Sequence, residues 1–383
     1  MLSEHDSHRG RRIGIVSYDY DPPIGGLGVL VKTYVDELQK LHVEDTYTVI
    51  SPSAHADEHG SHFGRARYRK SGGCPLFSLS LLFSLTRIIR RCQCDLLHVH
   101  SGSGGVFLLR RPPCKLIVTA HHTYRQEADL VFMRSPLKKL LKLFMALLES
   151  RTYHMADIVV CVSKDTAQEI ISQYSVPASR VCVIENPVQV AEAESLRAQP
   201  TQKNTIVFVG RLEHRKGIIV LLEAFCILKK NIPDARLRLI GSNLIGSHLT
   251  SVIEKLGLKD AVTILGYVQN SDRFREMAQA TAIVIPSLLE GFGLVAAEAM
   301  VLGTCVIASD VPGLRSIISD NHTGLLFPVG HVSALAETMK RVLTDTNLRQ
   351  TLENAALAEA PQRFSVERRT HDQSDVYSRF LVQ

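Results

Sequence analysis

Short apolar segments alternate with segments of helical composition, and this alternation occurs twice along the chain. In the first half, strands are expected near 12–18, 46–51, 96–100, 115–120, 157–163 and 181–184. In the second half, they are expected near 205–209, 235–240, 261–265, 282–286, 304–308 and 323–327. Strands that alternate with helices at this spacing form a parallel sheet. The pattern therefore predicts an α/β fold with two Rossmann-like domains that face a central cleft.

The length of 383 residues also favours two domains, because it exceeds what one hydrophobic core usually serves. We expect an N-terminal domain over 1–187, a polar, alanine-rich linker over 188–203 and a second domain over 204–362. A last helix is expected over 363–383. A further helix is expected directly after the glycine-rich turn that ends at Gly105.

Composition and cysteine usage limit the class of protein. Hydrophobic residues make up 45% and charged residues 21% of the chain, which is ordinary for a soluble globular protein. The first ten residues are polar, so no signal peptide is expected, and the longest apolar run, 76–89, is too short to span a bilayer. Among eight cysteines the only close pair is Cys92 and Cys94, with no second pair at metal-ligand spacing, so reduced thiols in the cytoplasm are expected.

The net charge of +6 is uneven. Residues 1–187 hold 23 Lys and Arg against 18 Asp and Glu, a balance of 23 − 18 = +5. The remainder holds 44 − 23 = 21 against 38 − 18 = 20, or +1. A basic first half favours an anionic acceptor or a membrane surface. Neither zinc-finger spacing nor an RNA-binding aromatic motif accompanies it, so nucleic acid is not expected as a partner.

The most informative run lies between 282 and 303. An apolar strand is followed by the turn Glu290-Gly-Phe-Gly293 and by a helix over 294–302 that Gly303 is expected to cap. Unpaired amides at the start of such a helix favour an anion such as phosphate. Glu298 lies roughly two helical turns beyond Glu290, so the two carboxylates are suited to different hydroxyl groups of one ligand.

Two further glycine-rich junctions follow strands. Gly210-Arg-Leu-Glu-His-Arg-Lys-Gly217 places Arg211 and Lys216 where both cations could bind one diphosphate. Near the N-terminus, Asp21-Pro-Pro-Ile-Gly-Gly-Leu-Gly28 precedes a helix and is compatible with phosphate, although it lacks dinucleotide-binding spacing. Asp19-Tyr-Asp21 spells a D-x-D triplet, a metal-binding signature of another architecture, and such triplets also arise by chance.

Together these motifs resemble the retaining glycosyltransferases of family 4, which have the GT-B fold. Glu290 and Glu298 match the E-x7-E signature, and Arg211 and Lys216 match the Gly-Arg-Leu-x-x-x-Lys-Gly motif. The sequence Glu185-Asn-Pro-Val188 is similar to the family hinge, with proline in place of the usual glycine. The resemblance implies transfer of a sugar from a nucleoside diphosphate, with retention, without a required metal or other cofactor. It also implies that the C-terminal helix packs back on the N-terminal domain.

The resemblance assigns roles residue by residue. Arg211, Lys216, Glu290 and His121 are the catalytic candidates, with Lys216 and Arg211 on the departing diphosphate and His121 beside the sugar. Glu298 is expected to hold the ribose and Glu290 the donor sugar. The remaining donor-binding positions are Gly25, Gly26, Gly210, Gly241, Val268, Gly291, Phe292, Gly293 and Leu294. Tyr267 is a further candidate, for stacking on the base.

Several alternatives stay open. His122 could take the place of His121, and His122, Tyr124 and Arg125 are expected to border the acceptor pocket. The helix near 137–148 fits either a core helix with a solvated basic face or docking on an anionic membrane. The expected location is the cytoplasm, with peripheral contact at the inner face of the membrane.

The resemblance predicts a hexosyl or N-acetylhexosaminyl transferase acting on a glycan, glycolipid or small-molecule acceptor, in polysaccharide or glycoconjugate biosynthesis of the cell envelope. A UDP-sugar donor is favoured by its frequency in the family. The alternatives are an epimerase or phosphorylase of the same fold, or a scaffold that binds a nucleotide-sugar without turnover.

Overall fold

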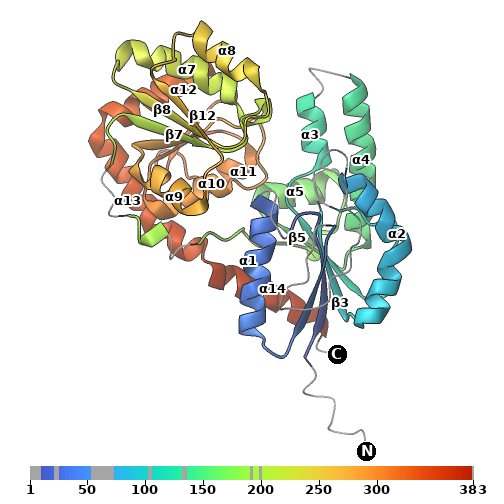
Figure 1. The fold of residues 1–383 in the computed structure, drawn as a ribbon. Helices are drawn as coiled ribbons and strands as arrows, with labels where there is room; N and C mark the ends of the chain where they lie inside the picture. Colours follow the sequence, from blue (N-terminus) through green and yellow to red (C-terminus); the bar gives the residue numbers. More distant parts are fainter. Residues whose placement is uncertain are drawn as a thin grey trace, which may run out of the picture. The chain divides into compact units, whose positions relative to one another are not determined.

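The chain forms two compact α/β units in a computed structural model that describes residues 10–20, 26–52, 73–101, 106–131, 136–189, 193–197 and 201–381. Unit 1 comprises Met1–Asn186 and Val366–Gln383, and unit 2 comprises Pro187–Ser365. Each unit contains a six-stranded sheet flanked by helices (Figure 1). The α/β fold expected from the alternating pattern is confirmed, and residues 188–203, which we expected to be a linker, are grouped with unit 2.

All strands of the unit 1 sheet are parallel, in the order β2-β1-β3-β4-β5-β6. The elements of unit 1 are β1 (Arg12–Val16), α1 (Gly26–Leu41), β2 (Thr46–Ile50), α2 (Gly73–Cys92), β3 (Leu96–Ser101), β4 (Lys115–Ala120), α3 (Tyr124–Val131), α4 (Pro136–Met155), β5 (Ile158–Cys161), α5 (Lys164–Gln173), β6 (Val181–Val183) and α14 (Val366–Leu381).

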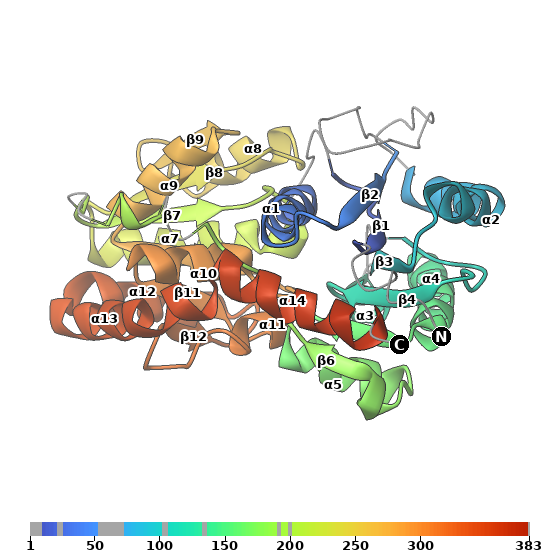
Figure 2. The ribbon, with the colours of Figure 1, turned by 90° about the horizontal axis from the view of Figure 1, so that it is seen from below.

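Helices cover both faces of this sheet. One apolar cluster joins the sheet to α2 and α5 and includes Tyr153 of α4. The other joins the opposite face to α1 and to α14, whose Val376 and Tyr377 are buried with Tyr34. Figure 2, seen from below, shows α1 and α14 on one side and α2 and α4 on the other. The C-terminal helix is therefore part of the N-terminal unit's core.

The helix expected after Gly105 is wrong. Residues 106–114 contain no helix, and the amides of Phe107 and Leu108 donate to Ser78 Oγ and Thr152 Oγ1, each at 3.0 Å. The segment is short and ends in two prolines, which cannot donate backbone hydrogen bonds within a helix. Val106, Phe107 and Leu108 are buried against α2 and α4 without forming a helix, so composition alone suggested the wrong element.

The strands of the unit 2 sheet are also all parallel, in the order β12-β11-β10-β7-β8-β9. The elements are β7 (Thr205–Val209), α7 (Ile218–Asn231), β8 (Arg236–Ile240), α8 (Ser247–Lys255), β9 (Val262–Gly266), α9 (Asn270–Gln279), β10 (Ala282–Ile285), α10 (Leu294–Leu302), β11 (Val306–Ser309), α11 (Pro312–Arg315), β12 (Leu325–Phe327), α12 (Val332–Thr344) and α13 (Thr346–Arg363).

The order of strands in each sheet reverses at one point. In unit 2 the reversal lies between β7 and β10, which pair directly, and in unit 1 it lies between β1 and β3. Ligands of open parallel sheets bind outside the carboxyl ends of the strands at such a reversal. The loops after these four strands are therefore the first places to look for a site.

Candidate functional site

The loops that follow β7 and β10 contain the two motifs of unit 2. Gly210 to Lys216 follow β7, and Ser287 to Gly293 follow β10. Two glycines allow these loops to pack closely. Gly217 has φ +71°, and a Cβ there would lie 1.8 Å from the carbonyl oxygen of Pro286. A Cβ at Gly313 would lie 2.3 Å from the carbonyl oxygen of Glu290. A side chain at Gly217 would separate the two loops, and one at Gly313 would push α11 away from the loop after β10.

Lys216 and Glu290 form an ion pair between these loops. Lys216 Nζ donates to Glu290 Oε1, and Ser287 Oγ donates to the same oxygen at 2.9 Å. The side chains are 19% and 13% exposed. Burial opposes ionisation of Glu290, but the Lys216 ammonium, with Arg215 and Ser287, outweighs it and lowers the pKa of the carboxyl group. The pair thus fixes a charged carboxylate and a cation at the reversal of strand order.

Arg211 does not share this ion pair. Its guanidinium pairs with Glu213, with Arg211 Nη2 at 3.1 Å from Glu213 Oε1, and its side chain is 57% exposed. Arg215 pairs with the same carboxylate at 3.3 Å and donates to the carbonyl of Leu289. Among the described contacts, the two cations of the motif therefore have different acidic partners, although both follow β7.

Glu298 lies on α10 and is held by an arginine from another helix. Arg273 of α9 bonds both carboxylate oxygens, with Nη2 to Oε1 at 3.0 Å, and the two side chains are 17% and 14% exposed. The guanidinium also lies 4.6 Å from the ring centroid of Phe274. Bidentate pairing fixes the orientation of a carboxylate as well as its charge. Glu290 and Glu298 are thus separately paired, one with a lysine and one with an arginine.

The turn between these glutamates has the expected form. Gly293 occupies the N-cap of α10 with φ +95°, a conformation that favours glycine, and α10 ends at the left-handed Gly303. The N-cap glycine has no side chain to bond the first amides of α10, so this end retains the polarity that attracts anions. Phe292 is buried and its ring meets Phe364 edge-on, while Gly291 and Leu294 are half-buried.

The other predicted donor positions in unit 2 lie at the ends of β7, β8 and β9. Gly210 and Gly241 follow β7 and β8, and a Cβ on Gly241 would lie 2.0 Å from the carbonyl oxygen of Gly210. Val268, two residues beyond β9, is half-buried, whereas Tyr267 is 84% exposed. These positions lie beside one another because parallel neighbours end at one edge of the sheet.

In unit 1, His121 follows β4 and is held by a buried polar chain. His121 Nε2 lies 2.9 Å from His100 Nδ1, and His100 Nε2 lies 2.5 Å from the hydroxyl of Tyr34. His100 is fully buried at the end of β3, and its ring stacks on His121 with centroids 5.2 Å apart. The position and ring orientation of His121 are therefore fixed by a strand neighbour and by helix α1.

A second buried histidine, His98, connects this region to the C-terminal helix, and its ring centroid lies 4.7 Å from that of His100. His98 Nδ1 lies 2.7 Å from the hydroxyl of Tyr377 on α14, and its Nε2 lies 2.7 Å from Thr119 Oγ1. Burial, with neighbouring positive groups including Arg369, lowers the pKa of His98 and His100 well below the usual value. Burial beside His122 lowers the pKa of His121 to about 3. All three imidazoles are therefore neutral at physiological pH.

The three residues predicted to border an acceptor have different surroundings. His122 Nε2 lies 3.3 Å from Glu127 Oε1, and Arg125 is exposed. Tyr124 is 5% exposed and packs on Phe107, with its ring centroid 5.4 Å from that of Phe107. Tyr124 therefore has a packing role at the start of α3.

The glycine turn after β1 falls partly outside the described residues. Gly25 and Asp21 lie outside them, and Gly26 is exposed as the first residue of α1. Asp19 Oδ2 accepts a hydrogen bond from the amide of Gly28 at 3.0 Å, so Asp19 contacts the first turn of α1. Within the described residues, no cluster of three or more His, Cys, Asp or Glu side chains is arranged to hold a metal ion.

Sequence reasoning missed the residues that hold the predicted ones. Ser287 lies in the same run as Glu290 and could have been noticed as a hydroxyl three residues away. Arg273 could not, because it belongs to a different helix 25 positions from Glu298. Tyr34, which contacts His100 behind His121, was hidden in the same way, since it comes from α1.

Both halves of the chain match known families. Residues 24–192 match the family model described as Glycosyltransferase Family 4, and residues 192–358 match the model described as Glycosyl transferases group 1. A D-inositol 3-phosphate glycosyltransferase from Salinispora arenicola is 31% identical over 311 residues, which cover 74% of this chain and 68% of that protein.

Other relatives match over shorter stretches. An N-acetylgalactosamine-N,N'-diacetylbacillosaminyl-diphospho-undecaprenol 4-alpha-N-acetylgalactosaminyltransferase from Campylobacter jejuni is 25% identical over 235 residues, covering 61% of this chain and 62% of that protein. The matches to three further relatives, at 31–32% identity, span only 55–59% of the length of those proteins.

Solved structures share the fold over nearly the whole chain. Sucrose-phosphate synthase from Thermosynechococcus elongatus has a TM-score of 0.79 at 22% identity, covering 96% of this chain and 98% of that one. HepE from Anabaena, in complex with UDP and glucose, has a TM-score of 0.71 at 20% identity, covering 96% and 100%. At such identities the likeness shows the fold alone.

Proposed function

Since this chain belongs to the family 4 glycosyltransferases and has the GT-B fold, we propose that it transfers a hexosyl or N-acetylhexosaminyl group from a nucleoside-diphosphate sugar to a glycan, lipid-linked or small-molecule acceptor. The proposed reaction retains the anomeric configuration and needs no metal ion. The observation that carries the proposal is the partly buried Lys216–Glu290 ion pair beside the glycine turn before α10. A cation and helix amides in one place suit a departing diphosphate.

The roles follow from charge. Lys216 and Arg211, with the backbone of Gly291 to Leu294, stabilise the negative charge on the departing diphosphate. Because Arg211 is more than half exposed, it can turn toward a bound phosphate at little cost in packing. Lys216 already lies at the site, so it contributes without rearrangement. Cations held in place in this way favour the transition state, where the charge on the leaving group is greatest.

The carboxylates recognise hydroxyl groups. Glu290, kept ionised by Lys216, accepts hydrogen bonds from the donor sugar, to which His121 is also assigned. Glu298 accepts from the ribose, with its remaining charge balanced by Arg273. A neutral His121 accepts or donates one hydrogen bond without adding charge. The proton of the acceptor hydroxyl passes to the leaving phosphate, so no protein carboxylate has to act as a base.

The donor and acceptor classes are supported by relatives. HepE was solved with UDP and glucose, which supports UDP as the nucleotide of this chain's donor. The Campylobacter jejuni relative is named for a diphospho-undecaprenol substrate, which supports a lipid-linked acceptor in cell-envelope glycoconjugate or polysaccharide biosynthesis. A lipid-linked acceptor lies at a membrane, so the proposal includes peripheral contact with an anionic membrane surface at its cytoplasmic side.

A thermal-shift comparison of UDP, GDP, ADP and TDP tests the donor site. At a concentration of about 100 times its dissociation constant, the correct nucleotide stabilises the protein by about 2.7 kcal/mol. For a unit of this size that raises the melting temperature by about 5 to 10 °C. We expect UDP to give the largest shift. Equal, negligible shifts with all four nucleotides would contradict the proposal, and binding without transfer or hydrolysis of any UDP-sugar would favour a scaffold.

A further inference from the structure

The apolar residues of α4 point away from the core. Five of them recur at helical spacing and have exposed side chains: Leu137 (76%), Leu140 (65%), Leu141 (58%), Phe144 (56%) and Leu147 (68%). The opposite side of the helix is the buried one, with Ala146, Glu149, Thr152 and Tyr153. Of the two alternatives for this helix, the one in which these leucines form a core face is therefore wrong. An amphipathic helix normally buries its apolar stripe, so a stripe turned outward needs a partner.

Helix α2 has a second exposed apolar patch on the same side of the sheet. Leu76, Leu79, Leu82 and Phe83 are 54%, 48%, 37% and 75% exposed. Figures 1 and 2 both show α2 and α4 on one face of the unit 1 sheet, the face opposite α1 and α14. We call the exposed residues of α2 and α4 the docking face. Its apolar residues are grouped on two helices of one face of the sheet and are not scattered singly over the surface.

The docking face is basic as well as apolar. Helix α2 contains Arg87, Arg90 and Arg91 and no acidic residue. Helix α4 contains Lys138 and Lys139 beside the leucines, and its only acidic residue, Glu149, is buried. Burial raises the pKa of Glu149 to about 8, because its effect is larger than that of the hydrogen bonds from Tyr174 and a backbone amide, which lower this pKa. Glu149 therefore adds little negative charge. The partner of this face is expected to be both apolar and anionic.

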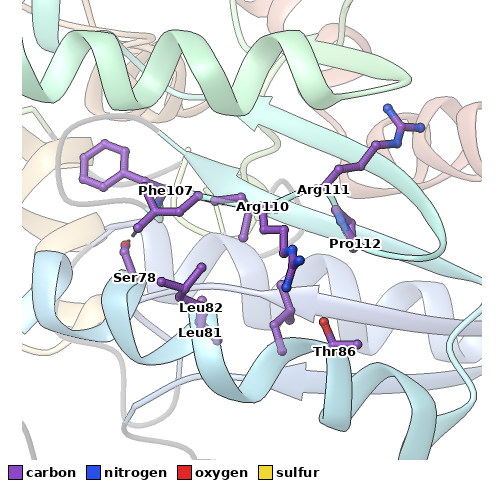
Figure 3. Close-up of a pocket in the computed structure, with 11 residues that line it drawn as sticks. Ser78, Leu81, Leu82, Thr86, Phe107, Arg110, Arg111 and Pro112 are labelled. Atoms are coloured by element: carbon purple, nitrogen blue, oxygen red, sulfur yellow. Dashed lines mark hydrogen bonds between the residues drawn. The ribbon is translucent and has the colours of Figure 1, made fainter.

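One small cavity lies beside the docking face, at helix α2. A cavity of about 10 Å³, roughly the space of one water molecule, lies between α2 and the segment 107–112. Figure 3 shows Phe107 and Leu82 at this cavity, with Arg110 extending from the segment toward α2 near Thr86. The cavity is too small for a sugar or a nucleotide. The docking face is thus a surface to be covered and not a pocket to be filled.

We propose that the docking face binds the surface of a lipid bilayer that contains anionic lipids, with the leucines and phenylalanines of α2 and α4 entering the acyl boundary and their lysines and arginines meeting the head groups. In-plane amphipathic helices bind membranes by this combination of apolar area and positive charge. None of the helices in the described ranges is long and apolar enough to cross a bilayer, which agrees with a helix lying on the surface.

A second copy of the chain fits this face less well. A symmetric dimer would bring the same patch of both copies together, so the basic residues of α2 and α4 would face like charges. Neither helix has an exposed acidic residue that could balance these positive charges across the interface. An anionic lipid surface removes this repulsion and also accepts the apolar side chains.

Co-sedimentation of the full chain with vesicles tests the proposal. One set of vesicles contains equal parts of phosphatidylglycerol and phosphatidylcholine, and the other contains phosphatidylcholine alone. The wild-type chain should bind the anionic vesicles at least tenfold more tightly, and added salt should weaken the binding. Equal binding to both sets, or binding to neither, would overturn the proposal.

Paired variants separate the two contributions. The double variant Leu140→Gln with Phe144→Gln should bind anionic vesicles about tenfold or more weakly, because two large apolar groups are lost from the interface. Val43→Gln is the matched control, since Val43 is 78% exposed in the turn between α1 and β2 and should change nothing. Lys138→Glu with Lys139→Glu should weaken binding by roughly 30-fold or more at low salt, with Lys230→Glu on α7 as its control.

The remaining outcomes have defined meanings. All the altered residues are exposed or half-buried, and an unchanged melting temperature checks that each variant folds. If the wild type dimerises through this face and fails to bind lipid, a second copy is the partner and the proposal falls. Because the proposal deepens the proposed function, UDP binding is measured on the same samples. Lipid binding without UDP binding would overturn the assigned reaction and leave the docking face intact.

Discussion

Two glutamates with little exposed surface, one in each unit, differ in charge. Glu149 of unit 1 accepts hydrogen bonds from the amide of Tyr124 at 3.0 Å and from the hydroxyl of Tyr174 at 2.6 Å, and burial raises its pKa to about 8. Glu290 of unit 2 has a side chain that is only 13% exposed, but Lys216 lies against it and its pKa is lowered. Hydrogen bonds alone do not offset the loss of water around Glu149, whereas the Lys216 ammonium, with Arg215 and Ser287, does so for Glu290.

This difference separates a structural group from a candidate functional one. A neutral carboxyl group joins α4 to α3 and α5 without needing a counter-ion. A charged carboxylate at the carboxyl end of a parallel strand can bind hydroxyl groups strongly, because hydrogen bonds to a charged acceptor are about twice as strong as neutral ones. His98 and His100 follow the same rule as Glu149, since they are buried without an opposite charge and remain neutral.

The largest effect on activity is expected from removing the Lys216 ammonium, which distinguishes Glu290 from Glu149. Lys216→Ala would leave Glu290 buried without a positive neighbour at hydrogen-bond distance, so the pKa of Glu290 should rise as that of Glu149 does. We expect glycosyl transfer to fall by about 10²-fold or more in Lys216→Ala and in Glu290→Ala, as removal of one preorganised stabiliser typically causes. Initial rates with saturating donor measure it.

A control distinguishes loss of charge from loss of folding. Lys230→Ala removes an exposed lysine from α7 in the same unit and should leave the rate unchanged. Full activity of Lys216→Ala, with the fold intact, would show that the ion pair is only structural.

The neutral state of Glu149 has a consequence for stability against pH. Its folded pKa of about 8 is above its usual value of 4.5, so the folded state binds more protons than the unfolded state between these values. Its stabilisation is complete below pH 4.5 and is lost as pH rises through about 8. The slope is up to about 1.4 kcal/mol per pH unit.

The variant Glu149→Gln should remove this slope, because glutamine has the same shape and cannot ionise. Urea unfolding followed at a series of pH values measures the free energy of unfolding. His371→Gln, at an exposed site on α14, is a control that should keep the slope. A wild-type free energy independent of pH across this window would mean that Glu149 is charged.

A smaller effect is expected where the carboxylate already has a bidentate partner. Glu298→Gln should weaken donor binding by about tenfold, because a charge-assisted hydrogen bond to the ribose becomes a neutral one. Titration calorimetry with UDP measures the dissociation constant. Arg273→Ala is the companion variant, since it removes the ion pair and keeps the carboxylate. If both variants lose stability equally and UDP affinity does not change, Glu298 holds α9 to α10 and does not bind the donor.

No effect at all is expected from a chelator. The proposed stabilisation of the diphosphate comes from Lys216, Arg211 and backbone amides, so EDTA should leave the rate of transfer unchanged. Complete loss of transfer on addition of EDTA, with recovery after a divalent cation is restored, would contradict the metal-independent reaction.

Much of the fold was predictable because its signals are local. Alternating apolar and helical segments gave strands close to their observed positions, and helix α10 begins at Leu294 and ends at Leu302 as expected. The helix predicted after Gly105 was wrong because the structure there depends on contacts that are distant in the sequence. There the backbone amides bond side chains of α2 and α4, and only the folded unit brings those partners near.

The candidate site was predictable in part for the same reason. Lys216 and Glu290 were identified from short motifs, and the pairing of β7 with β10 brings those motifs together. Arg273 and Tyr34 belong to no motif near the residues they contact, so nothing local signalled them. The outward direction of the α4 leucines was equally hidden, because a helical repeat fixes which residues share a face and not what that face meets.

The sequence by itself determined the α/β alternation, the glycine turns that allow close approach, and the types of side chain at the strand ends, since each depends on neighbours a few residues apart. The tertiary structure decided which charges are paired. Burial raises or lowers a pKa according to the groups that packing brings near, so only the folded units make Glu290 an anion, Glu149 a neutral acid and His121 a neutral base.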